Sequence, residues 1–301
     1  MKSDAYSYRP FKGLAPALLS GLIGLGCILS LTDTSLALSV QAQVDTGAID
    51  QFSDPFMRFF IGDSQGKIDQ VGPVTATSTT NVGDVFAAGT ATSEYGAEHG
   101  IVSVSYAGPP NEGSGRAAAT SHMTGTWSDE FSVVSSNLAH GTPVALTGRL
   151  TLDGVAFADG GFVNGMVEAS LINYNTGDRF ALTYTYGAGS LAGGFLLSTP
   201  ITINTSVGDR ISIAGALQMQ ANVDTIYMPA SGTQRIAPSA LIFDVSHTAL
   251  FTLTSATPGA GFIAASGTSY APVSSVPEPS TWLLLGTGLV GLTWWRRKQA
   301  A

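Results

Sequence analysis

The stretch Phe180-Ala-Leu-Thr-Tyr-Thr-Tyr186 alternates large apolar side chains with smaller ones. Successive side chains of a β-strand point to opposite faces, so the aromatic rings and the leucine share one face and both threonines share the other. This alternation is typical of a strand that buries one face and exposes the other. The stretch therefore predicts a half-buried β-strand.

The same alternation recurs elsewhere in the chain, at residues 101–106, 210–213, 241–245 and 249–254. Turn-forming residues separate these runs, as in Asn175-Thr-Gly-Asp178, Asp159-Gly-Gly161 and Val207-Gly-Asp209. No long segment of residues 43–271 has helical periodicity. We therefore expect an all-β fold, namely one β-sandwich passenger domain of jelly-roll-like type at residues 43–271.

The first 42 residues have the pattern of a signal peptide. A positively charged start precedes an apolar run at residues 14–31, and small residues follow it. Val40-Gln41-Ala42 fits the small-residue rule for cleavage and favours a cut between Ala42 and Gln43. Ser35-Leu36-Ala37 is a second candidate, and an uncleaved anchor is the alternative to a signal peptide.

Residues 272–301 combine a proline-rich stalk, an apolar run and a basic end. Pro277 and Pro279 cannot donate backbone hydrogen bonds, so they predict an extended stem. Residues 280–295 carry no charge and, with their flanks, approach the length that crosses a bilayer. Arg296, Arg297 and Lys298 favour the cytoplasmic side. The tail is therefore predicted to be a transmembrane helix with the C-terminus inside and the preceding domain outside.

The sequence around the two prolines resembles the PEP-CTERM sorting signal of Gram-negative bacteria, through Val276, Pro277, Glu278, Pro279 and Ser280. The basic cluster matches the end of that signal. Residues 246–270, which end in Ser266-Gly-Thr-Ser-Tyr270, resemble the last strands of many PEP-CTERM passenger domains. The resemblance implies recognition by an exosortase-type enzyme and removal of the tail near the motif. A plain C-terminal anchor is the alternative.

The same resemblance implies a location and a role for the passenger domain. The protein would be exported, held transiently in the inner membrane, and then displayed at the cell surface or released. A structural or adhesive role in an exopolysaccharide or biofilm matrix follows from the family's association with such matrices. The alternatives are a carbohydrate-binding module and, with less support, a secreted hydrolase.

The charge of the chain between Gln43 and Ser275 is strongly acidic, with 7 Lys and Arg against 18 Asp and Glu, a net charge of −11. An acidic surface repels phosphate backbones, so we expect no nucleic-acid partner. The sole cysteine, Cys27, lies in the predicted leader. The passenger domain therefore has no internal disulfide, and its stability must come from a packed core.

The sequence contains no strong catalytic or metal-binding motif. The four histidines lack metal-ligand spacing, and no G-x-S-x-G elbow is present. We therefore expect no enzymatic activity, no metal site and no cofactor. Ca²⁺ remains open because oxygen ligands occur near turns, at Asp153, Asp159, Asn173, Asn175 and Asp178.

Trp127 and Asp129 are the candidate sugar contacts, because an aromatic ring beside an acidic group suits a sugar face. The alternative is an exposed turn beside a half-buried Trp127. Glu130 completes a carboxylate pair of the kind that glycoside hydrolysis needs. Neighbouring strand residues point to opposite faces, however, so Asp129 and Glu130 are not expected to act together.

Overall fold

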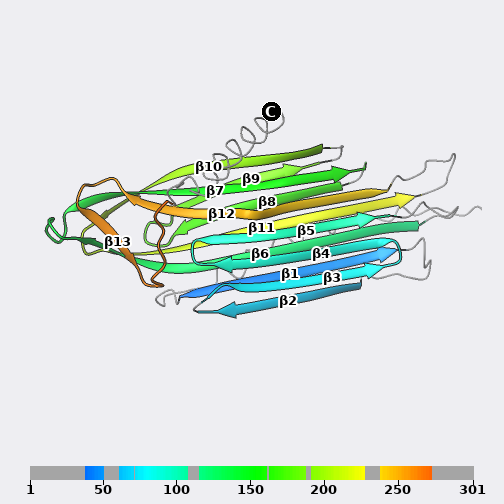
Figure 1. The fold of residues 1–301 in the computed structure, drawn as a ribbon, viewed down its shortest axis with the longest axis horizontal. Helices are drawn as coiled ribbons and strands as arrows, with labels where there is room; N and C mark the ends of the chain where they lie inside the picture. Colours follow the sequence, from blue (N-terminus) through cyan, green and yellow to red (C-terminus); the bar gives the residue numbers. More distant parts are fainter. Residues whose placement is uncertain are drawn as a thin grey trace, which may run out of the picture.

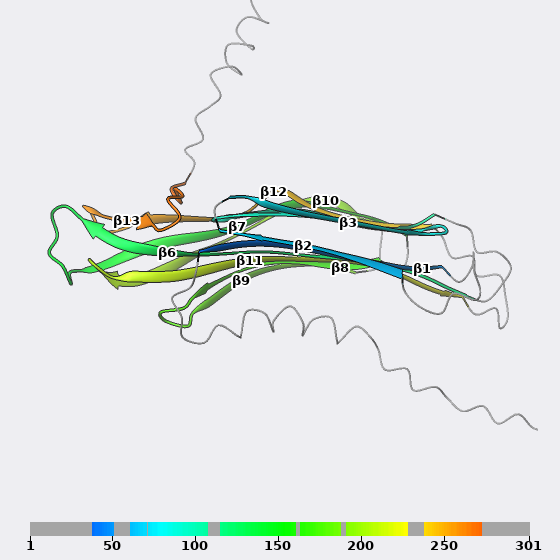
Figure 2. The same ribbon diagram turned by 90° about the horizontal axis from the view of Figure 1, so that it is seen from below.

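The computed structural model describes residues 38–50, 61–70, 72–107, 115–160, 163–187, 191–227 and 238–272. Within these ranges the regular elements are all β-strands, and they form two antiparallel sheets packed face to face (Figures 1 and 2). The predicted all-β sandwich is therefore confirmed. The predicted signal peptide as far as residue 37, and the predicted transmembrane helix, lie outside the described residues.

The first sheet, called sheet A here, has the strand order β2-β1-β6-β11-β8-β9, and β13 pairs with the end of β6. Its strands are β1 (Ser39–Asp50), β2 (Ile61–Asp69), β6 (Gly115–Ser135), β8 (Val163–Asn173), β9 (Arg179–Tyr186), β11 (Arg210–Tyr227) and β13 (Ala260–Ala264).

The second sheet, called sheet B, has the order β10-β7-β12-β5-β4-β3. Its strands are β3 (Val74–Val82), β4 (Val85–Glu94), β5 (Ala97–Tyr106), β7 (Pro143–Asp159), β10 (Leu191–Ser206) and β12 (Ser239–Ser255). From β9 to β13 the chain crosses between the two sheets at every step, a connection pattern that jelly rolls share.

The predicted strands fall within observed ones, with one difference at β12. Residues 241–245 and 249–254 form a single strand, β12, whose register shifts after Asp244. Val245 and Ala249, on either side of this shift, are both buried, so the same alternate positions face inward before and after it. The side chains of Leu241 and Leu253 are both fully buried although the two runs read as separate strands in the sequence.

The core lies between the two sheets and is built by strict alternation along the strands. In β7 every even-numbered residue from Val144 to Ala158 is buried. An aromatic cluster fills one end of the core, and the rings of Phe131 and Tyr270 pack edge to face with centroids 4.8 Å apart. Such pairs add to the stabilisation that burial itself provides. This end of the sandwich is also where the last described segment of the chain is attached.

Candidate functional site

Trp127 and Asp129 both point into the sandwich from β6, so the predicted sugar contact at these residues was wrong. Trp127 is 3% exposed and Asp129 is 0% exposed. The Trp127 ring packs against Tyr270 and Phe251, with centroid distances of 5.7 and 5.9 Å. A fully packed ring has no free face for a sugar.

The buried Asp129 carboxylate is held by the end of the passenger domain. The backbone N–H of Ser266 donates to Oδ1 at 3.1 Å, and the Tyr270 hydroxyl donates to Oδ2 at 2.7 Å. The Ser266 hydroxyl and the backbone N–H of Glu130 also donate to this carboxylate. We call Asp129, Ser266 and Tyr270 the C-terminal clasp. Its geometry is that of a satisfied structural carboxylate, since each oxygen accepts two hydrogen bonds.

Asp129 and Glu130 lie on opposite faces of β6, as the strand periodicity predicts. Glu130 is half-buried on the outer face and forms an ion pair with Arg210 on β11. The two carboxylates therefore do not face a common substrate position, and this pair offers no geometry for glycoside hydrolysis.

The predicted cleavage position between Ala42 and Gln43 lies inside β1. Val40 and Ala42 are both 0% exposed, and Val40 pairs with Trp127 across the sheet. Cleavage at Gln43 would remove these core residues. The alternative at Ser35-Leu36-Ala37 ends just before β1 begins at Ser39. The position of β1 favours this second candidate, and both stay predictions.

The sorting-motif residues Val276–Ser280 and the basic residues Arg296–Lys298 lie outside the described residues. In the part of the chain that the structure describes, no helix has the length and apolar character to span a membrane. The predicted membrane helix therefore stays a prediction.

The histidine and turn residues considered as ligands are not gathered into a metal centre. Over the described ranges, no group of three His, Cys, Asp or Glu side chains is close enough to hold an ion. In the turn after β8, Asn173 Oδ1 accepts the backbone N–H of Asn175 at 3.0 Å, and Thr176 donates to Asp178. These oxygens stabilise the turn, and calcium binding there stays untested.

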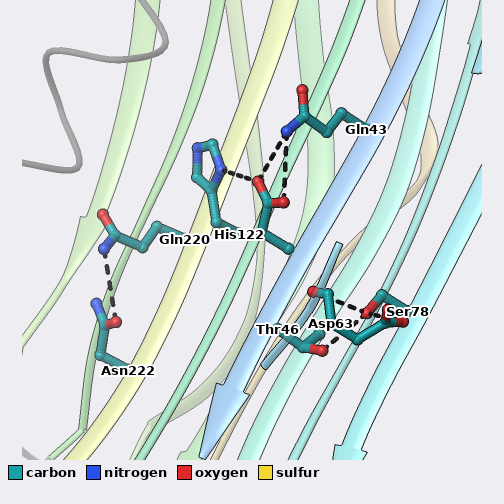
Figure 3. A network of polar contacts seen from close by, with 8 residues as sticks. Gln43, Thr46, Asp63, Ser78, His122, Gln220 and Asn222 are labelled. Atoms are coloured by element: carbon teal, nitrogen blue, oxygen red, sulfur yellow. Dashed lines mark hydrogen bonds and ion pairs between the residues drawn. The ribbon is translucent and has the colours of Figure 1, made fainter. Parts of the chain in front are cut away.

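A different polar surface, which the sequence analysis missed, lies on the outer face of sheet A (Figure 3). We call it the amide face. Antiparallel registers align its side chains across β1, β6, β11 and β8. It consists of Gln41, Gln43, Asp45, Thr120, His122, Thr124, Thr126, Asn164, Gln218, Gln220 and Asn222.

The side chains of the amide face are ordered by contacts with one another. Gln43 Nε2 donates to the Asp45 carboxylate at 3.1 Å, and His122 Nδ1 lies 3.8 Å from the same group. Asn222 accepts from Gln220 at 3.5 Å and donates to Asn164 at 3.1 Å. The nearby His122 and the hydrogen bond from Gln43 lower the pKa of Asp45, against the opposing effect of its partial burial. The carboxylate therefore stays ionised, and the surrounding amides are held in fixed orientations.

The amide face presents mostly neutral hydrogen-bonding groups, and Asp45 is the one carboxylate among the residues that define it. Each amide offers both donors and acceptors, and each threonine hydroxyl can do either. Neighbouring rows lie about 4.8 Å apart, because that is the spacing of strands in a sheet. None of the residues that define the face is Phe, Trp or Tyr. Such a surface suits a polyhydroxylated polymer bound through hydrogen bonds.

Glu98 on β5 is a further buried acid that the sequence analysis did not single out. It is 2% exposed, and its Oε1 has no hydrogen-bond partner among the described residues. Gly125 on β6 faces it, since a Cβ there would lie 3.5 Å from the Glu98 carboxyl carbon. Burial raises the pKa of Glu98 well above its ordinary value of 4.5. The carboxyl group is therefore uncharged over a pH range in which an exposed glutamate is ionised.

Comparison with known proteins gives a specific result for the C-terminal tail. Residues 275–298 match the model of the PEP-CTERM protein-sorting motif, which confirms the resemblance noted from the sequence. No curated protein matches the chain.

Two solved structures show distant likenesses. The first is described as "Structure of TmCBM61 in complex with beta-1,4-galactotriose at 1.4 A resolution". It has 15% identity and a TM-score of 0.18, and the match covers 46% of this chain and 70% of that one. The second, "Structure of infectious bursal disease virus Gx strain", has 12% identity, a TM-score of 0.15 and coverages of 82% and 72%. Likenesses with such low TM-scores carry no functional argument.

Removing the tyrosine hydroxyl from the clasp is expected to destabilise the passenger domain. Tyr270→Phe keeps the ring in the aromatic cluster but takes one donor from the buried Asp129 carboxylate, at a cost of about 1–3 kcal/mol. Urea unfolding measures the decrease in the free energy of unfolding. Tyr174→Phe is the control, because Tyr174 lies outside the clasp in the turn after β8. Equal stability of Tyr270→Phe and the wild type would show that the clasp contributes nothing.

The raised pKa of Glu98 predicts a dependence of stability on pH. Because the folded-state pKa lies above the unfolded one, the unfolded state loses its proton first as the pH rises from about 4.5. The free energy of unfolding therefore decreases from that pH until the folded-state pKa is passed. Glu98→Gln removes this contribution, so the variant should gain stability relative to the wild type as the pH rises above about 4.5 until the folded-state pKa is passed. A constant difference across this window, measured by urea titrations, would contradict the assignment.

Proposed function

From the PEP-CTERM protein-sorting motif at residues 275–298 we infer that the chain is exported and processed by an exosortase-type enzyme. The passenger sandwich is then displayed at the cell surface or released into the extracellular matrix. The match to the sorting motif is the observation that carries this proposal. The long apolar run and basic end of the tail are consistent with transient anchoring in the inner membrane before processing.

We further propose that the passenger domain acts in the matrix by binding polysaccharide through the amide face. The oriented amides on β1, β11 and β8 support this role, because they can exchange hydrogen bonds with sugar hydroxyls. The expected net charge of −11 disfavours an acidic polymer, since like charges repel. The ligand class is therefore a neutral, hydroxyl-rich polysaccharide. This function requires no catalytic residue, and the expectation that the protein is not an enzyme stays a prediction.

Export and processing predict a specific intact mass for the protein recovered from its own host. We expect a species that begins near Leu38 and ends near Val276, found outside the inner membrane. Mass spectrometry of each cell fraction measures both ends. A species that retains Trp282 to Ala301 and stays in the inner membrane would contradict processing. A start at Gln43 would instead show that the first two core positions of β1 are removed.

Polysaccharide binding predicts a loss of affinity when amide-face side chains are truncated. The double substitution Gln220→Ala and Asn222→Ala removes two neighbouring amides. We expect roughly tenfold weaker binding to the host's extracellular polysaccharide, since each lost hydrogen bond costs about 0.5–1.5 kcal/mol. Isothermal titration or affinity electrophoresis measures this change.

The matched control removes two amides from the opposite side of the molecule. Asn81 on β3 and Asn204 on β10 are exposed on the outer face of sheet B. Asn81→Ala with Asn204→Ala should leave the affinity unchanged. Equal losses in the two double variants, or no binding by the wild type, would refute the amide face as the binding surface.

A further inference from the structure

Strand β2 is an open edge of sheet A. It pairs with β1 on one side, and no described strand pairs with its other side. All nine of its residues are exposed, including Ile61 at 52% and Ile68 at 70%. An edge strand of this length presents a row of backbone N–H and C=O groups that can pair with another strand.

Strand β2 contains no proline, whereas one edge strand of sheet B does. The edge strand β10 of sheet B carries Pro200, whose nitrogen cannot donate a hydrogen bond to an added strand. The pairing of β2 with β1 is continuous from Ile61 to Asp69. The backbone of β2 is therefore regular enough to accept a partner strand along its full length.

The charges on β2 are arranged for a partner of the same sequence. Lys67 forms no ion pair within the described part of the chain, whereas Arg116, Arg179 and Arg210 each do. Asp63 lies four residues before Lys67 and so on the same face of the strand. Its carboxylate accepts a hydrogen bond from Ser78 at 2.9 Å, which fixes its position at the rim of the sandwich (Figure 3).

We propose that two copies of this protein associate by antiparallel pairing of β2 with β2 of the second copy. The register that pairs all nine residues places Ile61 opposite Asp69 of the second copy, and Gln65 opposite itself. The same register places Lys67 opposite Asp63 of the second copy, twice by symmetry. Opposite charges that face each other across a sheet are stabilising.

The neighbouring registers are less favourable in charge pairing and in strand overlap. A shift of two residues in one direction places Asp63 opposite Asp69 of the second copy, which juxtaposes two carboxylates. A shift in the other direction places Lys67 opposite Ile61. Each shift also leaves two residues of each strand unpaired. Strand overlap and charge therefore select one symmetric dimer, of the self-complementary type that twofold interfaces require.

This dimer would join the two A sheets into one continuous sheet. The twofold axis of an antiparallel strand pair is perpendicular to the sheet, so the outer face of one copy continues as the outer face of the other. The two amide faces then lie on the same side and offer two sites to one polymer chain. The dimer itself does not rest on the proposed binding function, since it follows from β2 alone.

A single cysteine at the centre of β2 tests the pairing in the full chain expressed in its host. In the proposed dimer the two Gln65 residues lie opposite each other, with Cα atoms about 4.5–5.5 Å apart, within the range that a disulfide bridges. The sole native cysteine, Cys27, precedes β1. Gln65→Cys should therefore give a disulfide-linked dimer on a non-reducing gel after mild oxidation.

The control is Thr183→Cys, which places a cysteine at an exposed position on β9, the opposite edge of the same sheet. We expect at least about tenfold less cross-linked dimer from this variant and from the wild type. Absence of the dimer with Gln65→Cys, or equal amounts with Thr183→Cys, would overturn the proposal.

A charge-swap series provides a second, independent readout. Lys67→Glu replaces two attractive pairs by two repulsive ones, so we expect the dimer to be roughly tenfold weaker by sedimentation equilibrium. Adding Asp63→Lys restores opposite charges across the interface and should recover most of the affinity. Arg149→Glu, a charge reversal at an exposed position of β7, should have no effect. Weakening by Lys67→Glu without recovery in the double variant would overturn the proposed register.

Discussion

The buried carboxylate of Asp129 is the constraint on which one whole end of the sandwich depends. An ionised group in the interior costs several kcal/mol unless hydrogen bonds replace its lost hydration. Ser266 and Tyr270, which lie more than 130 residues later, supply those bonds. The tyrosine ring also packs against Phe131 and Trp127. The Asp129 carboxylate is therefore fully hydrogen-bonded only when the last segment of the passenger domain packs onto β6, which couples the two parts of the chain.

Strand periodicity predicted the sandwich. The same periodicity along β6 indicates that Asp129 faces the interior. Trp127, Asp129, Phe131 and Val133 alternate with smaller or more polar residues, and the two apolar members Phe131 and Val133 mark this face as buried. The tryptophan–carboxylate pair suggested a sugar site only because it was considered apart from that series. The amide face could not be found in this way. Gln220 and Asn222 show the alternation, but their alignment with Asn164 and His122 depends on strand registers that join distant segments.

The amide face and the clasp show two ways in which this protein accommodates polar groups with few charges. Inside, Asp129 is saturated by donors from Ser266, Tyr270 and the neighbouring Glu130, whereas Glu98 avoids the cost of charge by keeping its proton. On the outer face of sheet A, partly buried amides bond to each other and leave further donors and acceptors facing solvent. A surface of this kind stays soluble without strong charge, and it can exchange its hydrogen bonds with solvent for those of a neutral polymer. The proposed contact with polysaccharide requires a surface of this kind.

The position of the clasp also limits how the sorting motif can be presented. Tyr270 is fixed in the core, and the motif match begins at residue 275. Five residues span at most about 18 Å even when fully extended. An enzyme that acts at the motif on an already folded passenger must therefore work close to the end of the sandwich that carries the clasp. Because the clasp lies before the motif in the chain, removal of the tail would leave every hydrogen bond of Asp129 in place, and the passenger domain would keep its core.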